Sequence, residues 1–428
     1  MKNYVIESSS KIIADKEIYE LLDLALKGRK SIHKALILPP DITRINSYAG
    51  TITKMLIKIL NGVEVDVMPA IGTHAPMTDS EIEKMYEGIP RENFVVHRWR
   101  DDTVKIGEIP RDFVKEVSAN CMDEDINVEI NKRIIDSDYD IVISVGQVVP
   151  HEVAGMANYN KNIFVGCGGK EIINASHYIS ALYGIDKIMG RIDTPVRKIF
   201  DYAEEKFLFD VPVLYILTVT TQHNSSTNVE CLAVGRGIEI FERSAQVSKE
   251  KNITLVSEPL KKAVVYLSPI EFKSTWLGNK AIYRTRLAMA DDGELIIIAP
   301  GVCECSEDKE NDRLIRKYGY RKRDEIIEIV SKDQEMRRNL SVAAHLIHGS
   351  VDDRFRITYA TAHMTKEEIE GLNYCYMPLD RAMEKYNVGK LKEGFNRIGK
   401  EEVFFISNPA LGLWVYDEKF LVKEKLKN

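Results

Sequence analysis

Two imidazoles and an amine lie close together in one stretch near the middle of the sequence. They belong to His151, Lys161 and His177. An imidazole gains and loses a proton near neutral pH, and a lysine amine can bond covalently to an electrophilic carbon. The stretch follows an apolar segment, Ile141 to Val145, that predicts a buried strand. Because α/β proteins bind ligands in the loops after their strands, we expect a site for chemistry here.

A third imidazole, His74, follows another apolar segment, Val63 to Met68, in the short sequence Gly72-Thr73-His74. Two imidazoles after neighbouring strands suit general acid and base chemistry. For either histidine alone, a loop position with a hydrogen bond to the backbone is the more common situation.

Asp41 and Arg44 follow the apolar segment Lys34 to Leu38. A guanidinium can hold a carboxylate through two hydrogen bonds, as the binding of a small acid requires. Asp41 can accept from a ribose hydroxyl or orient Arg44. A local Asp–Arg pair within a turn is the alternative.

A glycine-rich turn, Gly166 to Gly169, precedes a segment that predicts a helix, Lys170 to Tyr183. The backbone N–H groups of Gly168 and Gly169 could hold a phosphate at the start of this helix. The turn matches neither the Rossmann nor the P-loop fingerprint, and a plain turn would also explain it.

Apolar segments alternate with amphipathic ones along much of the chain, which predicts parallel strands joined by helices. The expected strands cover residues 34–38, 63–68, 94–96, 141–145, 213–219, 263–267 and 294–298, and the expected helices cover 48–60, 78–86, 170–183, 195–207, 237–251 and 276–289. At 428 residues the chain is too long for one core. We therefore expect an α/β protein of two domains, residues 1–258 and 259–428, each with a mostly parallel sheet flanked by helices and with the active site in the cleft between them.

The composition excludes some classes of partner. The formal net charge of -6 gives no basic surface for nucleic acid or an anionic membrane, and no apolar run has the length of a membrane span. The N-terminal residues lack the apolar core of a signal peptide. Six cysteines in a chain of this size do not form a disulfide framework, so we expect a cytoplasmic protein.

The spacing of these residues resembles the lactate racemase family, whose members carry a nickel-pincer nucleotide. Pro150-His151, Ala154-Gly155, Lys161 ten positions after the histidine, and His177 sixteen positions after the lysine all follow the family pattern. The family's Gly-Gly-Arg before the lysine is replaced by Asn158-Tyr159-Asn160, so the chain resembles a divergent member.

The resemblance implies roles for these residues. Lys161 would be bonded covalently to the cofactor, and His177 would bind the nickel through a neutral imidazole. His74 and His151 would act as acid and base, while Arg44 would hold the substrate carboxylate. Asp41, Gly168 and Gly169 would contact the nucleotide.

The implied reaction is inversion of C2 of a 2-hydroxy acid, by hydride transfer to and from the nickel-pincer nucleotide. The substrate is lactate or a larger sugar acid. Lys280 resembles a family lysine in the second domain, although the family's glutamine before it is Leu277 here, and Arg284 and Arg286 follow it. A surface basic face is the alternative for this group.

Two other interpretations stay open at the level of sequence. One is a zinc-dependent hydrolase that uses His74, His151 and His177, and the other is a non-catalytic nucleotide- or anion-binding protein. Proteins that build the cofactor are the implied partners, and the sequence leaves the oligomeric state unknown. As a hypothesis, His345 and His348 shape a polar pocket for a larger hydroxy acid, with helix packing as the alternative.

Overall fold

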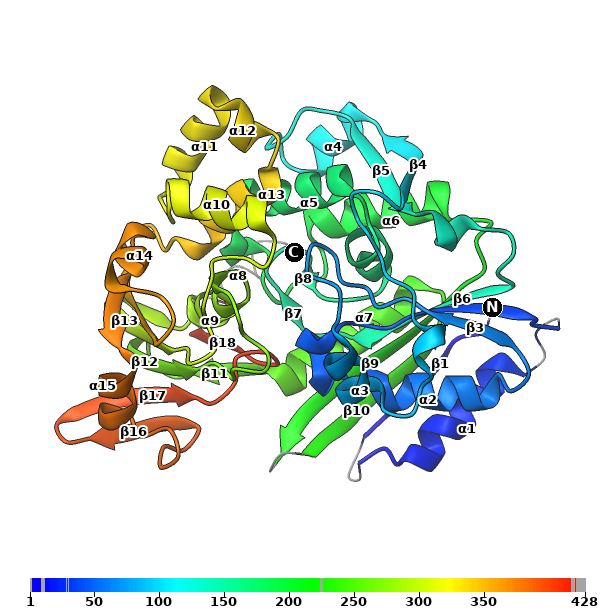
Figure 1. The fold of residues 1–428 in the computed structure, drawn as a ribbon, viewed down its shortest axis with the longest axis horizontal. Helices are drawn as coiled ribbons and strands as arrows, with labels where there is room; N and C mark the ends of the chain where they lie inside the picture. The colour runs from blue at the N-terminus through cyan, green and yellow to red at the C-terminus, as the bar shows by residue number, and fades with distance from the viewer. Residues whose placement is uncertain are drawn as a thin grey trace. The chain divides into compact units, whose positions relative to one another are not determined.

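The structure is a computed structural model that describes residues 2–8, 12–27, 29, 31–223, 226–416 and 420. It divides into two compact units (Figure 1). The first unit comprises Met1–Ile179 and Met189–Asn252, and the second comprises Ser180–Ile188 and Ile253–Asn428. Both ends of the predicted domain ranges, Met1 and residues 421–428, lie outside the described residues.

The first unit contains a six-stranded sheet in which the central strands run parallel. Its strand order is β1 (Tyr4–Glu7), β10 (Ser226–Gly235), β9 (Val213–His223), β6 (Ile141–Gln147), β2 (Lys34–Leu38) and β3 (Glu64–Val67). The pairs β9–β6, β6–β2 and β2–β3 are parallel, whereas β1 and β9 each pair antiparallel with β10. All seven residues of β6 are buried, as expected for a central strand covered on both faces.

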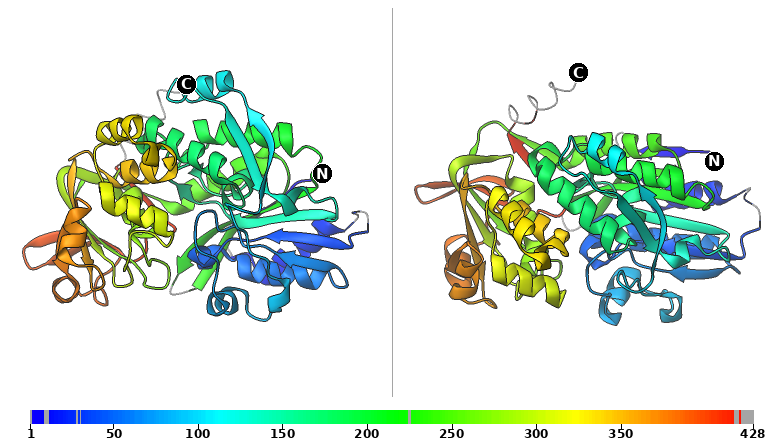
Figure 2. Two further views of the ribbon diagram at one scale, coloured as in Figure 1. Left: turned by 45° about the horizontal axis from the view of Figure 1, so that its top comes forward. Right: turned by 90° about the horizontal axis from the view of Figure 1, so that it is seen from above.

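Helices cover both faces of this sheet, and the alternation of side chains along β2 shows how. Ala35 and Ile37 pack into one core and Leu36 and Leu38 into another. One face is covered by α1 (Asp15–Leu26), α2 (Ala49–Ile59) and α3 (Asp79–Tyr86), and the other by α5 (Lys170–Tyr183), α6 (Pro195–Phe207) and α7 (Ile238–Asn252). Figures 1 and 2 show α1 and α2 on one side of the sheet and α5 and α6 on the other.

Most of the predicted elements of this unit are present. Helix α3 begins at the predicted cap, where Thr78 accepts from the N–H of Glu81 and the Glu81 carboxylate accepts from the N–H of Thr78. The predicted strand at 94–96 is wrong, because Phe94 forms only a single bridge with Val67. A small ribbon, β4 (Thr103–Ile109) and β5 (Ile126–Asn131), precedes β6 together with α4 (Arg111–Val117).

The second unit contains a mostly parallel six-stranded sheet of its own. The strand order is β15 (Cys375–Pro378), β14 (Phe355–Thr361), β13 (Met289–Ile298), β12 (Leu260–Tyr266), β17 (Glu401–Ile406) and β16 (Gly394–Ile398). Only β16 pairs antiparallel in this sheet. Two further strands, β11 (Ile253–Val256) and β18 (Leu413–Tyr416), pair parallel with each other.

The predicted helix at 276–289 is wrong in its extent. Residues 275–285 form two short helices that are interrupted at Asn279, and the chain is already extended at Met289. The Asn279 side chain is hydrogen-bonded to the hydroxyls of Tyr359 and Tyr374. The helices of this unit are α8 (Thr275–Gly278), α9 (Lys280–Thr285), α10 (Lys309–Tyr318), α11 (Arg323–Lys332), α12 (Gln334–Arg337), α13 (Leu340–Gly349), α14 (Lys366–Gly371) and α15 (Leu379–Lys385).

The expected fold class, α/β with parallel-rich sheets flanked by helices, is confirmed. Among the described helices, none combines the length and the apolar character needed to cross a membrane.

Candidate functional site

Three neighbouring parallel strands of the first unit deliver most of the predicted site residues. Asp41 and Arg44 follow β2, His74 follows β3, and His151 follows β6. The carboxyl ends of parallel strands meet at one edge of a sheet. The loop that carries Lys161 is tied to this edge, because the Asn162 side chain donates to the carbonyl oxygen of Leu38 and to the hydroxyl of Ser144, each at 3.0 Å.

Asp41 is hydrogen-bonded to His74. Its side chain caps the short 3-10 helix Ile42–Ser47 by accepting from the N–H of Thr43. Its other oxygen, Oδ2, lies 2.6 Å from Nδ1 of His74. The Asp41 side chain is 6% exposed and that of His74 is 26% exposed, so the imidazole reaches a partly open space while its carboxylate partner lies beneath.

His151 is held by the backbone of its own loop. It lies in the small ribbon formed by β7 (Pro150–His151) and β8 (Gly155–Met156). The backbone N–H of Val153 donates to Nδ1 of His151 at 3.0 Å. On the other side of the ring, Nε2 lies 3.8 Å from a carboxylate oxygen of Glu152.

His177 lies in α5 with one nitrogen already engaged. Its Nδ1–H donates to the carbonyl oxygen of Ile173, one helical turn earlier, at 2.7 Å. Burial lowers the pKa of His177 to about 4, with the positive charge of Lys161 acting in the same direction and Glu152 opposing it. The ring is therefore neutral at pH 7 and presents the lone pair of Nε2, which is the form that binds a metal ion.

Several candidate residues lie close enough to His177 to change its pKa. The charges of Lys161 and His74 lower this pKa, and that of Glu152 raises it. Burial lowers the pKa of the Arg44 guanidinium, and the carboxylates of Glu152 and Asp41 raise it. The Glu152 carboxylate therefore acts on two of the candidate site residues, His177 and Arg44, although its sequence position alone did not predict this. Its position directly after His151 was the available signal.

The backbone before Lys161 is strained. Asn158 and Tyr159 adopt left-handed conformations, with φ of 66° and 57°. Asparagine tolerates this region, whereas tyrosine adopts it at a cost. The ring of Tyr159 is packed between Tyr215 and Phe241, with centroid distances of 4.4 and 5.4 Å.

The buried Arg197 guanidinium further fixes this strained segment. It donates to the carbonyl oxygens of Met156, at 2.7 Å, and Asn158, at 3.3 Å, and to the side chain of Asn160. Lys161 follows directly, is half-buried, and precedes a π-helical turn, Asn162–Gly166. Packing and hydrogen bonds therefore determine where the lysine leaves the backbone.

Gly168 and Gly169 do not offer the expected phosphate cradle in this conformation. Their N–H groups donate to the carbonyl oxygens of Val165, at 3.3 Å, and Glu129, at 2.9 Å. A Cβ at Gly168 would lie 1.8 Å from the carbonyl oxygen of Phe164. These glycines are needed for close packing, and this corrects the interpretation of their N–H groups as anion donors.

A histidine that the sequence analysis did not select holds this turn in place. Nε2 of His97 donates to the carbonyl oxygen of Gly168 at 3.2 Å, and the Asn131 amide donates to Nδ1 at 3.0 Å. The ring is 1% exposed, and burial lowers its pKa to about 4. His97 is therefore neutral and structural. No sequence spacing distinguished it from other histidines.

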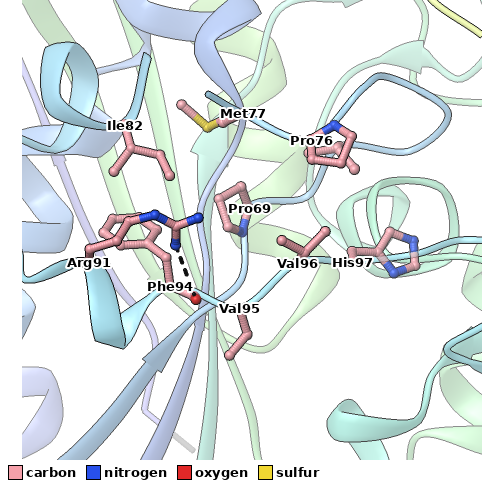
Figure 3. Close-up of a pocket in the computed structure, with 10 residues that line it drawn as sticks. Pro69, Pro76, Met77, Ile82, Arg91, Phe94, Val95, Val96 and His97 are labelled. Carbon is pink, nitrogen blue, oxygen red and sulfur yellow. Dashed lines mark hydrogen bonds between the residues drawn. The ribbon is translucent and has the colours of Figure 1, made fainter. Parts of the chain in front are cut away.

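A small pocket lies beside this region but is not a second candidate site. Figure 3 shows that it is lined mainly by proline and aliphatic side chains, with His97 at its edge. The Arg91 guanidinium donates to the carbonyl oxygen of Phe94 at 3.4 Å. The mostly apolar lining of this pocket offers few groups for acid–base chemistry or for binding a metal ion.

The remaining predicted residues belong to the second unit. Nζ of Lys280 lies 5.8 Å from the centre of the Phe272 ring, and its charge opposes the rise that burial causes in the pKa of Glu271. Its role at the site stays a prediction.

His345 is packed inside the second unit, and its role in a substrate pocket stays a prediction. It stacks on Trp276 and is hydrogen-bonded to the hydroxyls of Tyr283 and Tyr320 at 2.9 and 2.8 Å. Nε2 of His348, also buried, lies 3.4 Å from the Ser180 hydroxyl. Arg286 donates to Asp186 and to the carbonyl oxygen of His348. These contacts place both histidines in the hydrogen-bonded interior of the second unit.

Within the described part of the chain, no group of three or more His, Cys, Asp or Glu side chains is arranged to hold a metal ion. A zinc site built from His74, His151 and His177 therefore lacks support. A metal bound by one imidazole, with its other donors supplied by a cofactor, does not require such a group.

Comparison with known proteins relates the first part of the chain to a protein family. Residues 24–184 match the model of the lactate racemase N-terminal domain. Lactate racemase of Lactiplantibacillus plantarum is 29% identical over 154 residues, which are 34% of this chain and 32% of that protein. The match thus spans about a third of the length of this curated relative.

Two solved structures share the fold over nearly the whole chain. A protein from Thermotoga maritima superposes with a TM-score of 0.82 at 23% identity, covering 96% of this chain and 99% of its own. The lactate racemase apoprotein from Thermoanaerobacterium thermosaccharolyticum superposes with a TM-score of 0.64 at 16% identity, covering 93% and 92%. Residues 24–184 thus resemble the lactate racemase N-terminal domain, and nearly the whole chain shares the fold of a lactate racemase apoprotein.

Proposed function

We propose that the protein is a racemase or epimerase that inverts C2 of a 2-hydroxy acid with a nickel-pincer nucleotide bound to its first unit. The observation that carries this proposal is the state of His177. Its imidazole is neutral, its Nδ1–H is bonded to the carbonyl oxygen of Ile173, and its pKa is lowered further by the charges of Lys161 and His74. One histidine suffices as a protein ligand because the pincer itself supplies the other donors to nickel.

The residues present fit the cofactor in their chemistry. Lys161 would hold it covalently and His177 would bind the nickel, which imidazole nitrogen suits. When bound, the group supplies the acceptor and donor of the hydride. Contacts of Asp41 with the nucleotide stay part of the proposal, and Gly168 and Gly169 would act through the shape of their turn.

The chain's own residues would position the substrate and move its proton. Arg44 holds the carboxylate of the 2-hydroxy acid. His74 and His151 face the C2 hydroxyl and handle its proton. Lactate and larger sugar acids both fit this chemistry, and the proteins that build the cofactor are the expected partners.

Intact-mass and metal analysis of the full chain, produced together with the proteins that build the cofactor, tests the proposal. We expect an adduct on Lys161 and about one nickel per chain, because each chain has one proposed cofactor site in its first unit. Lys161→Ala should lose the adduct, and His177→Ala should keep the adduct but release nickel. Lys170→Ala, which changes a nearby lysine at the start of α5, is the matched control and should keep both.

Other outcomes separate the alternatives. Bound zinc without an adduct would favour the hydrolase, and ligand binding with neither metal nor adduct would favour a sensor. Racemisation of lactate and of a panel of sugar acids by the loaded protein then identifies the substrate. An adduct and nickel without turnover of any 2-hydroxy acid would contradict the proposed reaction.

A further inference from the structure

We propose that the first unit contains a second ligand site, a cavity beside Tyr159 that binds a small organic cation, namely a protonated amine carried on an apolar body. The cavity has a volume of about 520 Å³, within the range that small-molecule sites occupy. All of its lining residues belong to the first unit. This site goes beyond the proposed function and does not depend on it.

Aromatic and aliphatic side chains form one part of the cavity wall. Tyr159 is buried, whereas Phe209 is 79% exposed and Ile238 is 41% exposed. Phenylalanine is usually buried in a folded protein. Two large apolar side chains exposed at one cavity indicate a surface that another molecule covers.

Three carboxylates and one guanidinium form the other part of the wall, and two of the carboxylates already have a cation. The guanidinium of Arg236 lies 3.6 Å from Glu204 and also donates to two backbone carbonyl oxygens. Glu205 is exposed and pairs with Lys206 at 2.9 Å. The charge that stays uncompensated is therefore that of the third carboxylate, Asp201.

Asp201 has a neutral partner instead of a cation. It accepts from the side-chain amide of Asn160 at 2.6 Å, and it makes no ion pair within the part of the chain that the structure describes. Arg197 directs its N–H groups to two backbone carbonyl oxygens and to the side chain of Asn160. Burial raises the pKa of Asp201, although the Arg197 charge and the Asn160 hydrogen bond oppose this rise. A cation in the cavity would supply the missing positive charge.

These contacts define the chemical class of the ligand. A protonated amine can form a charge-assisted hydrogen bond with Asp201, and an apolar body can cover Phe209 and Ile238. An anion would be repelled by the carboxylates, and a neutral ligand would leave the charge of Asp201 uncompensated. The volume favours a free amine over the chain of a partner protein.

The cavity also adjoins the segment that precedes Lys161. Tyr159 belongs to its wall, and Asp201 is hydrogen-bonded to Asn160, the residue directly before this lysine. A cation held at Asp201 would therefore lie beside the strained backbone described above.

Ligand-observed NMR titrations of the full-length protein without cofactor test the site at pH 7. Three probes share a phenyl ring and differ in charge: 2-phenylethylammonium, 2-phenylethanol and 3-phenylpropionate. We expect a Kd of roughly 1 mM or below for the ammonium, as is reasonable for so small a ligand. The alcohol should bind roughly 10-fold more weakly, because it cannot form the charge-assisted hydrogen bond. The propionate should not bind.

Two aspartate variants locate the bound probe. Asp201→Asn keeps an acceptor for the Asn160 amide and removes only the charge, so it should weaken binding of the ammonium roughly 10-fold and leave the alcohol unchanged. Asp210→Asn, at an exposed aspartate that does not line the cavity, makes the same change in net charge and should alter no affinity. Phe209→Ala should weaken binding of the ammonium and of the alcohol alike, by roughly 3-fold to 10-fold.

Unchanged binding of the alcohol shows that Asp201→Asn is folded, and the Phe209→Ala result does not depend on that variant. Equal affinities for the three probes, or equal losses in the two aspartate variants, would overturn the proposal. Binding of the peptide acetyl-Phe-Lys-amide without binding of 2-phenylethylammonium would overturn it as well, in favour of a partner chain. None of these outcomes depends on whether the protein binds nickel or racemises any acid.

Discussion

Two loops of the first unit differ in how their residue types fit their backbone conformations. They are residues 158–161 and residues 166–169. The first loop adopts left-handed conformations at Asn158 and Tyr159, where glycine would be easiest to accommodate. The second loop contains three glycines, and none of them has a positive φ. Its glycines are required because neighbouring atoms leave no room for a Cβ.

The difference shows that glycine content does not by itself identify a flexible or anion-binding loop. In the first loop, aromatic packing of Tyr159 and the hydrogen bonds of Arg197 compensate for strain directly before Lys161. In the second loop, close packing and His97 fix the start of α5, which carries His177. Both loops restrict the conformation of the backbone that presents a proposed cofactor contact.

The largest expected effect comes from filling the space at the second loop. Gly168→Ala places a Cβ 1.8 Å from the carbonyl oxygen of Phe164, and this backbone atom cannot move alone. We expect a loss of about 3 kcal/mol or more in the free energy of unfolding, measured by denaturant titration. Gly371→Ala, where a Cβ meets nothing within 4 Å, is the control and should be nearly neutral.

His97, which is hydrogen-bonded to Gly168 of the second loop, should make the stability of the protein depend on pH. Burial lowers the pKa of His97 to about 4, below the value of about 6.5 in the unfolded chain. The unfolded state therefore binds the proton first, so stability is complete above about pH 6.5 and falls as the pH drops towards 4. This one group should account for a loss of about 3 kcal/mol.

The variant His97→Gln separates this contribution from general acid denaturation. Its amide can still donate to Gly168 but does not titrate. The difference in unfolding free energy between the two proteins should shrink steadily from pH 7 to pH 4. Parallel stability curves would show that His97 is not the titrating anchor.

The smallest expected effect concerns backbone strain in the first loop. The sign of the difference in stability between two variants at Tyr159 shows whether this strain is present. Tyr159→Ala and Tyr159→Gly both remove the packed ring, but only alanine keeps the cost of the left-handed backbone. We expect the glycine variant to be the more stable by about 1 kcal/mol. Tyr215 lies in β9 and its ring packs against that of Tyr159. At this position the alanine variant should be more stable than the glycine variant, because glycine weakens a strand. The same order at both positions would argue against strain at Tyr159.

The sequence predicted the parallel core of the first unit well, because β2 and β6 are short apolar segments that end at polar loops. It failed where an element depends on distant partners. Phe94 makes only one bridge although its segment is apolar, and Asn279 interrupts a helical pattern through the hydroxyls of Tyr359 and Tyr374.

The site was predictable in its residues more than in its contacts. Spacing selected His151, Lys161 and His177, but it could not show that Nδ1 of His177 is occupied by the carbonyl oxygen of Ile173. It also did not suggest the hydrogen bond between Asp41 and His74, while a contact of Asp41 with a ribose or with Arg44 stays a prediction. Hydrogen bonds between residues that are far apart in sequence leave no pattern in a single chain.

The strand order of the first unit has a practical consequence for any attempt to cut the protein into pieces. The segment that matches the family model ends at residue 184, yet β9 and β10 lie beyond it and complete the same sheet. A fragment cut at that point would expose one edge of β6, whose seven residues are all buried in the intact chain. Such an edge invites pairing with other molecules, so expression of the matched segment alone should yield aggregates rather than a miniature of the first unit.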